Sequence, residues 1–335
     1  MKLPAGRPLN IMEVCGTHTH AIAKSGLAQL LKDKVNFISG PGCPVCVSAQ
    51  SDIDAMISLA LKPDVIIATF GDMMRVPGTK ISLQGAAAKG ADIRIVYNPL
   101  DAVALARENS GKKIVFLAVG FETTAPHAAA CALEAARLKL KNFYIYCCLK
   151  TIPPALKIIL DEKNDIDAFL LPGNVSVITG YKIFDFIARK YKKPAVVGGF
   201  SAAEIMEAVE TLLRAQKPLV GNTYAWASPR GNIAAQKIIA RVFKPVDGKW
   251  RGFGLIKKSA LTFKREFARF DAAKVFGIKP AKEPPTKCRC ALILKGKIKP
   301  SQCPYFGKAC TPLKPLGPCM VSAEGACAAC YNNGQ

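Results

Sequence analysis

The sequence predicts an α/β fold of two similar units, each built on a parallel sheet and together forming a cleft, followed by a part rich in loops, helices and cysteines. Short apolar runs alternate with amphipathic stretches from about Val35 to Gln216. Several of these runs end in Gly- or Pro-rich turns, and the alternation stops after about Pro218. Strands that are apolar on both faces are typical of parallel sheets covered by helices, with right-handed crossovers.

Seven runs are predicted strands because they are continuously apolar and rich in β-branched and aromatic residues. In chain order they are VNFIS (35–39), DVIIATF (64–70), DIRIVY (92–97), KIVFLAVG (113–120), NFYIYCC (142–148), DAFLLPG (167–173) and PAVVGG (194–199). The stretches between them repeat apolar residues every three or four positions, as a helix packed on a sheet requires. The predicted helices cover 51–62, 82–90, 100–109, 125–140, 153–162, 181–191 and 201–216.

The strands could form a single sheet, but two units meeting near Gly120–Pro126 are the more attractive division. Ligands of open parallel sheets bind beyond the strand carboxyl ends, so the polar turns there are expected to line one cleft. The expected domains are residues 1–120, 121–217 and 218–335, and the N-terminal segment is a candidate to pack against the third. Residues 221–243 and 259–272 resemble pieces of a helical hairpin. From Lys279 onward the segment has little apolar periodicity and is expected to need a metal centre to order it.

The length, apolar content and charge of the chain indicate a globular protein and argue against a membrane protein or a nucleic-acid binder. The chain has 335 residues, half of them apolar, which is enough for more than one core. No apolar run of about 18 residues and no signal-peptide pattern is present, so we expect no membrane association and a cytoplasmic location. The formal charge of +23 invites a nucleic-acid function, but the basic residues are spread along the chain without aromatic interleaving. Solvated faces or an acidic protein partner are therefore the favoured interpretation.

Thirteen cysteines in a long chain without an export signal point to metal binding or redox chemistry rather than disulfides. Ten of them fall in an N-terminal cluster and a C-terminal group. The other three, Cys131, Cys147 and Cys148, lie in apolar sequence and are expected to be inert buried thiols.

The N-terminal cluster is the first candidate site. Cys43 and Cys46 form a C-x-x-C in GPGCPVC, before a predicted helix, where the helix dipole lowers thiol pKa values and a disulfide can form reversibly. Two cysteines packed in a tight turn are the alternative. Cys15, in VCGTHTH, is a candidate metal ligand or nucleophile with His18 as base or proton shuttle, although His18 is equally well explained as structural. His20 is a weaker candidate.

Two further turns carry charged residues in apolar surroundings, where a charge is costly unless it is paired. GDMMRVPG supplies Asp72 and Arg75, which are equally well explained as a structural ion pair. GFETTAP supplies Glu122, for which a first-turn helix acid is the alternative. The chain contains neither of the glycine-rich nucleotide-binding motifs, so a standard nucleotide site is not supported.

The C-terminal cysteines form the second candidate site. Cys288, Cys303, Cys310 and Cys327 are separated by 14, 6 and 16 residues, unlike the paired spacing of zinc ribbons or the run in bacterial ferredoxins. Four thiolates from separate loops suit a 4Fe–4S cluster. The remaining cysteines of this region leave the ligand choice open on spacing alone; they are Cys290, Cys319 and Cys330.

Six motifs in order resemble the HypD family of hydrogenase maturation factors over nearly the whole chain. They are MEVCGTHTH, GPGCPVC, TFGDMMRVPG, GFETTAP, LPGNVSVITG and CPYFGKACTPLKPLGPCMVSAEGAC. The resemblance implies two α/β units plus a cluster-bearing part. It also implies a scaffold on which the Fe(CO)(CN)2 unit of NiFe hydrogenases is assembled, with redox activity rather than standard enzyme turnover. The implied partners are a HypC-type chaperone and a HypE-type cyanide donor, and we expect the free chain to be a monomer.

Carried over by position, the resemblance implies a role for each motif. Cys15 would bind the iron that carries CN and CO, together with the redox-active pair Cys43 and Cys46. The family's cluster spacing matches the C-terminal set of Cys288, Cys303, Cys310 and Cys327, with Cys330 as an additional thiol close to the last ligand. The polar residues implied to line the cleft and to move protons or hold ligands are His18, Glu122, Asp72 and Arg75.

Two rival functions remain from the sequence. One is a stand-alone thiol–disulfide oxidoreductase fed by an Fe–S centre, and the other is a basic zinc-dependent nucleic-acid binder. Each rival leaves one of the three cysteine motifs without a purpose, whereas the scaffold uses all of them.

Overall fold

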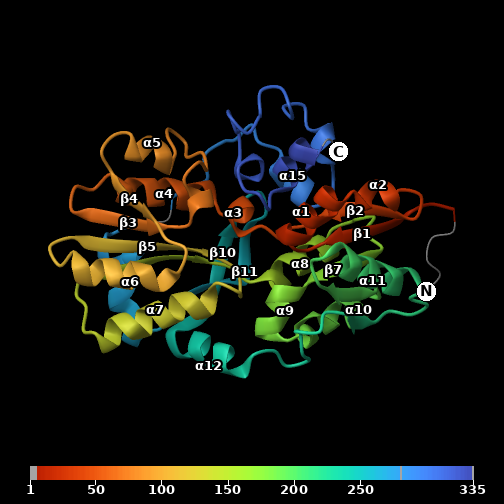
Figure 1. The fold of residues 1–335 in the computed structure, drawn as a ribbon, viewed down its shortest axis with the longest axis horizontal. Coiled ribbons are helices and arrows are strands. Elements are labelled where there is room, and N and C mark those ends of the chain that lie inside the picture. Colours follow the sequence, from red (N-terminus) through yellow and green to blue (C-terminus); the bar gives the residue numbers. More distant parts are fainter. Residues whose placement is uncertain (1–5, 280, 334–335) are drawn as a thin grey trace. The chain divides into compact units, whose positions relative to one another are not determined.

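The computed structural model describes residues 6–279 and 281–333, and its secondary structure confirms the α/β class with two parallel sheets. The chain divides into two compact units, each assembled from separated segments. The first unit contains the described parts of Met1–Cys46, Ile152–Ile233 and Cys288–Gln335, and the second contains Val47–Thr151 and Ala234–Lys287. Figure 1 labels the elements.

The first unit is built on a five-stranded parallel sheet in the order β2-β1-β7-β8-β9. Its strands are β1 (Leu9–Glu13), β2 (Val35–Ser39), β7 (Ala168–Pro172), β8 (Ala195–Gly198) and β9 (Val220–Asn222). Every residue of β7 and β8 is buried, as expected for central strands covered on both faces.

The helices of this unit come from all three of its segments. They are α1 (Gly16–Ser25), α2 (Leu27–Leu30), α3 (Pro44–Val47), α8 (Ile152–Asp161), α9 (Gly173–Thr179), η2 (Tyr181–Phe184), α10 (Asp185–Tyr191), α11 (Ala202–Leu213), α14 (Cys290–Leu294), η4 (Pro300–Gln302), η5 (Pro318–Met320) and α15 (Ala326–Asn333). α11 begins with a capping box in which Ser201 and Glu204 bond each other's backbone N–H groups. Ile205, Ala208 and Leu212 then form the helix face buried on the sheet.

The second unit is built on a four-stranded parallel sheet in the order β4-β3-β5-β6. Its strands are β3 (Val65–Thr69), β4 (Asp92–Ile95), β5 (Lys113–Gly120) and β6 (Phe143–Leu149). Its helices are α4 (Gln50–Ala60), η1 (Gly71–Met73), α5 (Leu83–Ala87), α6 (Pro99–Glu108), α7 (Ala125–Arg137), α12 (Ile233–Val242), η3 (Arg265–Phe270) and α13 (Ala272–Val275). In Figure 1, α4 and α5 lie on one side of this sheet and α6 and α7 on the other.

All seven predicted strands are present, but the predicted domain ranges of 1–120, 121–217 and 218–335 differ from the compact units. The difference arises because β1 pairs with β7 in parallel, Ile11 lying opposite Ala168. This pairing places β1 and β2 in one sheet with strands that follow residue 167. The short strands β1 and β9 are absent from the sequence prediction.

The predicted helical hairpin after residue 218 is wrong in its second half. Residues 233–242 are helical, but β10 (Phe243–Trp250) and β11 (Gly254–Phe263) form an antiparallel hairpin in the second unit. Phe243 lies opposite Phe263 with ring centroids 4.9 Å apart, and such a cross-strand aromatic pair stabilises a ribbon. Along β11 the side chains of Ser259, Leu261 and Phe263 are buried alternately, which is a strand period.

None of the helices in the described part of the chain combines the length and the apolar content that crossing a membrane requires.

Candidate functional site

Cys15 lies at the start of α1, in the turn that follows β1. Its backbone is extended (φ −143°, ψ 127°), and the helix begins at the next residue. Burial, and to a smaller extent the Glu324 carboxylate, raise the pKa of this thiol to about 11. The Thr17 hydroxyl and the amide groups of Thr17 and His18 oppose that increase without cancelling it. The thiol is therefore protonated near neutral pH and must lose its proton to bind a metal.

Cys43 and Cys46 are joined by a disulfide, with Cα atoms 5.2 Å apart. Both side chains are fully buried, and the Cys46 amide donates to Sγ of Cys43 at 3.1 Å. The pair spans the single helical turn α3, so its local geometry is that of a C-x-x-C at a helix start.

The two N-terminal motifs are packed together through their backbones. The Gly16 amide donates to the Gly42 carbonyl at 3.1 Å, and the Gly40 amide donates to the Glu13 carbonyl at 2.8 Å. A Cβ at Gly40 would lie 2.7 Å from that carbonyl oxygen, and one at Gly42 would lie 2.6 Å from the carbonyl carbon of Val14. The glycines of GPGC are thus required by the close approach of the turn that carries Cys15.

His18 is fully buried in the first unit. Its Nε2 lies 2.8 Å from the Gly199 carbonyl, and its ring stacks on Phe200 at a centroid distance of 4.8 Å. Burial lowers its pKa to about 4, so the ring is neutral near pH 7. Because Nε2 donates to a carbonyl, Nδ1 carries the lone pair, and within the described residues it has no hydrogen-bond partner. His20 is exposed on the same helix.

Glu13 is a buried ionisable residue that the sequence analysis missed. It ends β1 with 2% of its surface exposed, and its Oε1 accepts a hydrogen bond from the Thr19 hydroxyl at 2.6 Å. Burial raises its pKa to about 8, although bonds from Thr19 and Ser39 oppose the shift. The signal available in the sequence was an acid at the end of the apolar run LNIMEV, where a carboxyl must be either paired or protonated.

The C-terminal segment packs against the helix that follows Cys15. The Thr17 hydroxyl donates to Oε1 of Glu324 at 2.9 Å, and α1 contacts α15. A Cβ at Gly16 would lie 2.6 Å from the Glu324 carbonyl oxygen, so the approach is close. The first unit therefore contains all three cysteine motifs.

Five of the C-terminal cysteines interact electrostatically, and they are Cys288, Cys290, Cys303, Cys310 and Cys327. Cys288 and Cys303 each raise the pKa of Cys310 by repulsion between thiolates, in addition to its burial. Burial also raises the pKa of Cys327, as do the thiols of Cys288, Cys290, Cys303 and Cys310. Cys319 and Cys330 are buried in the same segment.

The surroundings of these thiols fit an Fe–S cluster in their chemistry. The Leu316 amide donates to Sγ of Cys310 at 3.3 Å, and N–H···S bonds of this kind tune cluster potentials. At Gly317 a Cβ would collide with Sγ of Cys288, so only glycine leaves room for that sulfur. In residues 6–279 and 281–333 no three His, Cys, Asp or Glu side chains converge as a single metal ion requires. A four-iron cluster binds each thiolate through a different iron, so its ligands need not converge on one point.

The remaining predicted site residues belong to the second unit. Asp72 lies in η1 after β3, and both it and Arg75 are exposed. No Asp72–Arg75 ion pair occurs among the salt bridges of the described residues. Glu122 is buried, 6% exposed, in the turn between β5 and α7, so it precedes the helix instead of opening it.

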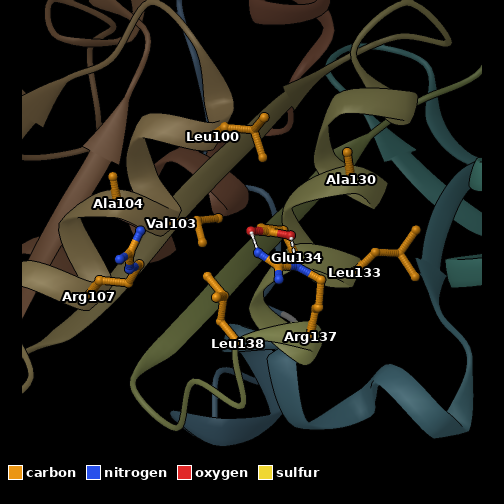
Figure 2. Close-up of a pocket in the computed structure, with 9 residues that line it drawn as sticks. All are labelled: Leu100, Val103, Ala104, Arg107, Ala130, Leu133, Glu134, Arg137 and Leu138. Carbon is orange, nitrogen blue, oxygen red and sulfur yellow. Dashed lines mark hydrogen bonds and ion pairs between the residues drawn. The ribbon is translucent and has the colours of Figure 1, made fainter.

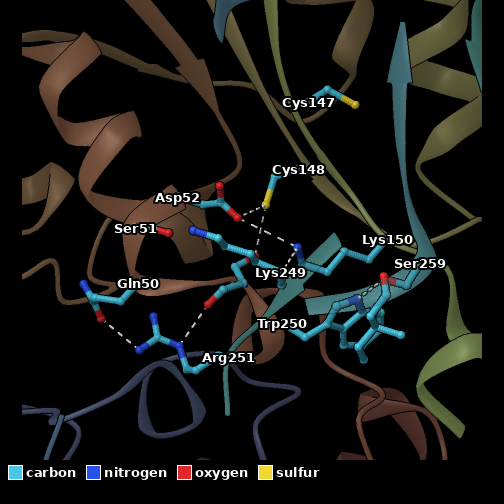
Figure 3. A network of polar contacts seen from close by, with 12 residues as sticks. Gln50, Ser51, Asp52, Cys147, Cys148, Lys150, Lys249, Trp250, Arg251 and Ser259 are labelled. Atoms are coloured by element: carbon cyan, nitrogen blue, oxygen red, sulfur yellow. Dashed lines mark hydrogen bonds and ion pairs between the residues drawn. The ribbon is translucent and has the colours of Figure 1, made fainter. Parts of the chain in front are cut away.

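A buried polar network at the end of β6 was also missed by the sequence analysis (Figure 3). Asp52 Oδ1 accepts from the Tyr146 hydroxyl at 3.1 Å, and Oδ2 lies 3.5 Å from the Cys148 thiol and 3.8 Å from Lys150 Nζ. Lys150 is 3% exposed and donates to the Lys249 carbonyl at 2.7 Å. Cys148 is buried, and burial raises its pKa to about 12, so the thiol is protonated near neutral pH.

Of the other two cysteines expected to be buried and inert, Cys131 is buried and Cys147 is half-buried. Burial raises the pKa values of Cys131 and Cys147 to about 12, and the Cys147 thiol donates to the Leu261 carbonyl at 3.2 Å.

A pocket between α6 and α7 of the second unit contains none of the predicted site residues (Figure 2). Its walls are mostly leucine, valine and alanine, and on the α7 side Arg137 pairs with Glu134, three residues earlier in the same helix, at 2.6 Å. The Leu100 side chain is 42% exposed there.

Comparisons with known proteins agree over almost the whole chain. The family model described as "HypD: Hydrogenase formation hypA family" matches residues 2–334. The chain is 47% identical over 335 residues to hydrogenase maturation factor HypD of Escherichia coli K12, covering 98% of this chain and 90% of that protein. It is 43% identical over 341 residues to HypD of Rhodobacter capsulatus, with shares of 98% and 90%. It is 42% identical over 344 residues to HypD of Cupriavidus necator, with shares of 98% and 91%.

Proposed function

Because the chain belongs to the HypD family of hydrogenase maturation factors, we propose that it is a scaffold on which the iron of a NiFe hydrogenase receives its CN and CO ligands. The observation that carries this proposal is the presence of three cysteine motifs in one compact unit, with Cys15 in a turn that contacts the C-x-x-C motif. A scaffold of this kind has redox activity without being a standard turnover enzyme.

In this proposal Cys15 is the principal iron ligand, assisted by Cys43 and Cys46. Thiolate is a soft ligand that suits iron carrying CN and CO. Because the pKa of Cys15 is about 11, iron binding must displace the thiol proton. Glu13, with a pKa of about 8, and the neutral ring of His18 are the nearby groups that can hold or accept a proton.

The disulfide supplies the redox element. Its reduction takes up two electrons and two protons and yields the free thiols of Cys43 and Cys46, which can then bind iron. We propose that Cys288, Cys303, Cys310 and Cys327 hold a 4Fe–4S cluster, which when bound supplies single electrons. The electrostatic interactions among these four thiols support this ligand set, and Cys290 also acts on Cys327.

The polar residues of the second unit enter the proposal as groups that hold ligands or move protons. Glu122 is the best supported of them because it is buried. Asp72 and Arg75 are exposed and unpaired with each other, so they are available to a ligand or partner.

The partners in this proposal are a HypC-type chaperone and a HypE-type cyanide donor, and the free chain is a monomer. Each of these assignments rests on the family, as does the cytoplasm as the place of assembly. A stand-alone thiol–disulfide oxidoreductase is the second candidate, favoured by the disulfide itself. If the chain turned over a small disulfide substrate without partner proteins, the oxidoreductase function would be favoured over the scaffold.

Anaerobic purification with a HypC-type partner tests the proposal. Iron and zinc analysis with UV–visible and infrared spectra of one sample should give about four cluster irons, a broad absorption band and CN or CO stretches. Cys15→Ala should keep the cluster spectrum and lose the CN and CO stretches, whereas Cys131→Ala should keep both. Zinc without iron would refute the cluster, and CN-ligated iron retained in Cys15→Ala would remove Cys15 from its role.

A further inference from the structure

Arg251 is a buried cation with an unused hydrogen-bond donor. Arg251 lies in the turn after β10 and is 4% exposed. Nε donates to the Ser48 carbonyl at 2.9 Å and Nη1 donates to Oε1 of Gln50 at 2.8 Å. Nη2 is buried and has no hydrogen-bond partner among the described residues. A buried guanidinium normally satisfies its charge with an anion, so the unused donor indicates a missing ligand.

The same place is the start of a helix. Gln50, which binds Nη1 of Arg251, is the first residue of α4, an eleven-residue helix. Its N-cap, Ala49, provides no side-chain cap. Figure 3 shows the Arg251 side chain beside Gln50 at this end of α4. The amide groups of a helix N-terminus and an adjacent guanidinium are complementary to the same ligand, an anion.

A carboxylate from a distant part of the unit already lies on these amides. Glu283 accepts from the Gln50 amide at 2.8 Å and from the Ser51 amide at 3.2 Å, and it also binds the Ser51 hydroxyl. Glu283 belongs to an exposed irregular segment before the C-terminal cysteines. Next to it, Lys249 binds the Ala281 carbonyl, so two separate contacts hold the segment there.

We propose that the start of α4 and Arg251 form a binding site for a small oxyanion, phosphate or carboxylate, which Glu283 occupies as an internal and exchangeable ligand. An entering oxyanion takes over the amides of Gln50 and Ser51 and engages Nη2 of Arg251 in addition. Exchange is feasible because Glu283 is exposed, and within the described part of the chain its carboxylate bonds only Gln50 and Ser51.

The charge of the surroundings favours this exchange. Asp52 is the acidic residue in the first turn of α4, and its oxygens already accept from Tyr146 and Cys148 and face Lys150. Arg251 has no carboxylate partner among the ion pairs of the described residues. The site therefore keeps a positive charge when Glu283 leaves. This inference does not depend on the role in hydrogenase maturation.

Titration calorimetry of the full chain with inorganic phosphate at constant ionic strength tests the site. Glu283→Ala frees the amides, and phosphate should bind it about tenfold more tightly than it binds Glu266→Ala, because charge-assisted bonds replace an internal competitor. Glu266 is a matched control, being an exposed acid of the same unit. Acetate should compete with phosphate, and chloride at the same ionic strength should not.

Two second-site variants in the Glu283→Ala background locate the ligand. Arg251→Lys keeps the charge but removes the guanidinium fork, and it should weaken phosphate binding about tenfold. Ser51→Ala removes the hydroxyl donor without disturbing a buried residue, and it should weaken binding by roughly threefold. Equal phosphate affinity in Glu283→Ala and Glu266→Ala would overturn the proposal. Affinity unchanged by Ser51→Ala in a chain with native circular dichroism would overturn it as well.

Discussion

The environment of Cys15 controls its chemistry more than its thiol group alone does. Free cysteine has a pKa near 8.5, whereas burial and the Glu324 carboxylate raise the pKa of Cys15 to about 11. A thiol in this state resists oxidation and alkylation, since the thiolate is the reactive form. Cys15 can therefore remain an unreactive thiol until a metal ion binds its sulfur and displaces the thiol proton.

The like charge of Glu324 gives a test at this residue. Glu324→Gln should lower the pKa of Cys15 and speed its alkylation by iodoacetamide at pH 8 by roughly threefold, equivalent to about half a pKa unit. The measurement is the modified fraction of the Cys15 peptide by mass spectrometry. Glu204→Gln, which alters a helix cap in the same unit, is the control and should leave that fraction unchanged. A slower reaction in Glu324→Gln would contradict the assigned electrostatics.

The buried carboxyl of Glu13 predicts a loss of stability at alkaline pH. Its pKa is raised from 4.5 to about 8, so the folded chain holds a proton that the unfolded chain releases. The stabilising contribution is full below pH 4.5 and is lost as pH rises toward and through about 8. Glu13→Gln mimics the protonated acid and should raise the thermal midpoint at pH 8.5 by at least about 3 °C, with little change at pH 5.

His18 has the opposite pH dependence, which must be separated from that of Glu13. Its pKa is lowered from 6.5 to about 4, so the unfolded chain binds the extra proton and stability falls as pH decreases through that range. Thermal scans between pH 6.5 and 8.5 therefore isolate Glu13. Glu266→Gln, which changes an exposed acid, is the control. If the thermal midpoints of Glu13→Gln and the native chain depend equally on pH, Glu13 is ionised in the folded chain and the prediction is wrong.

At the scale of elements, two turns define the candidate site by packing backbone against backbone. The turn after β1 carries Cys15, and the turn after β2 carries Cys43 and Cys46. β1 and β2 are neighbours in the sheet, so their carboxyl ends lie side by side. Glycines permit an approach that any side chain would prevent.

Gly42→Ala should disturb this contact. The added Cβ would lie 2.6 Å from the carbonyl carbon of Val14 and closer still to the Cys15 backbone, so the turns must separate. We expect a loss of about 1–3 kcal/mol in the free energy of unfolding and weaker iron binding. Gly111→Ala is the matched control, since its Cβ would meet nothing within 4 Å. Urea unfolding of both variants is the measurement, and equal midpoints would refute the contact.

At the scale of the whole molecule, each compact unit contains one tryptophan. Trp226 of the first unit is 78% exposed, whereas Trp250 of the second is 1% exposed and stacks on Phe121 at 5.9 Å. Fluorescence therefore reports mainly the unfolding of the second unit. The C-terminal cysteines belong to the first unit together with β1 and β2.

Loss of the proposed cluster should consequently destabilise one unit selectively. Cys310→Ala should lower the midpoint of the helix signal from the first unit and remove the cluster absorption, leaving the transition of Trp250 in place. Cys131→Ala, which changes a buried thiol of the second unit, serves as the control for thiol loss. An unchanged Fe–S spectrum in Cys310→Ala, or an equal shift of both transitions, would contradict this assignment.

Local sequence determined the fold class of this protein and the residues of interest. All seven predicted strands are present, because strands buried on both faces leave an apolar run that can be recognised without tertiary information. The cysteine motifs likewise stand out by spacing alone. Resemblance to a family supplied the function, and the comparisons confirm the family.

Tertiary structure alone decided how the strands pair and how far the burial and charge around each site residue shift its pKa. β1 pairs with β7 across more than 150 residues, with Ile11 opposite Ala168, and no local period encodes such a register. Residues 259–263 lie in a segment predicted to be helical, yet they belong to β11, where Phe263 lies opposite Phe243 on the partner strand. The pKa values of Glu13 and Cys15 depend on burial, and that of Cys15 depends also on Glu324, more than 300 residues away in sequence. Desolvation and charge act through space, so their effects appear only once the chain is folded.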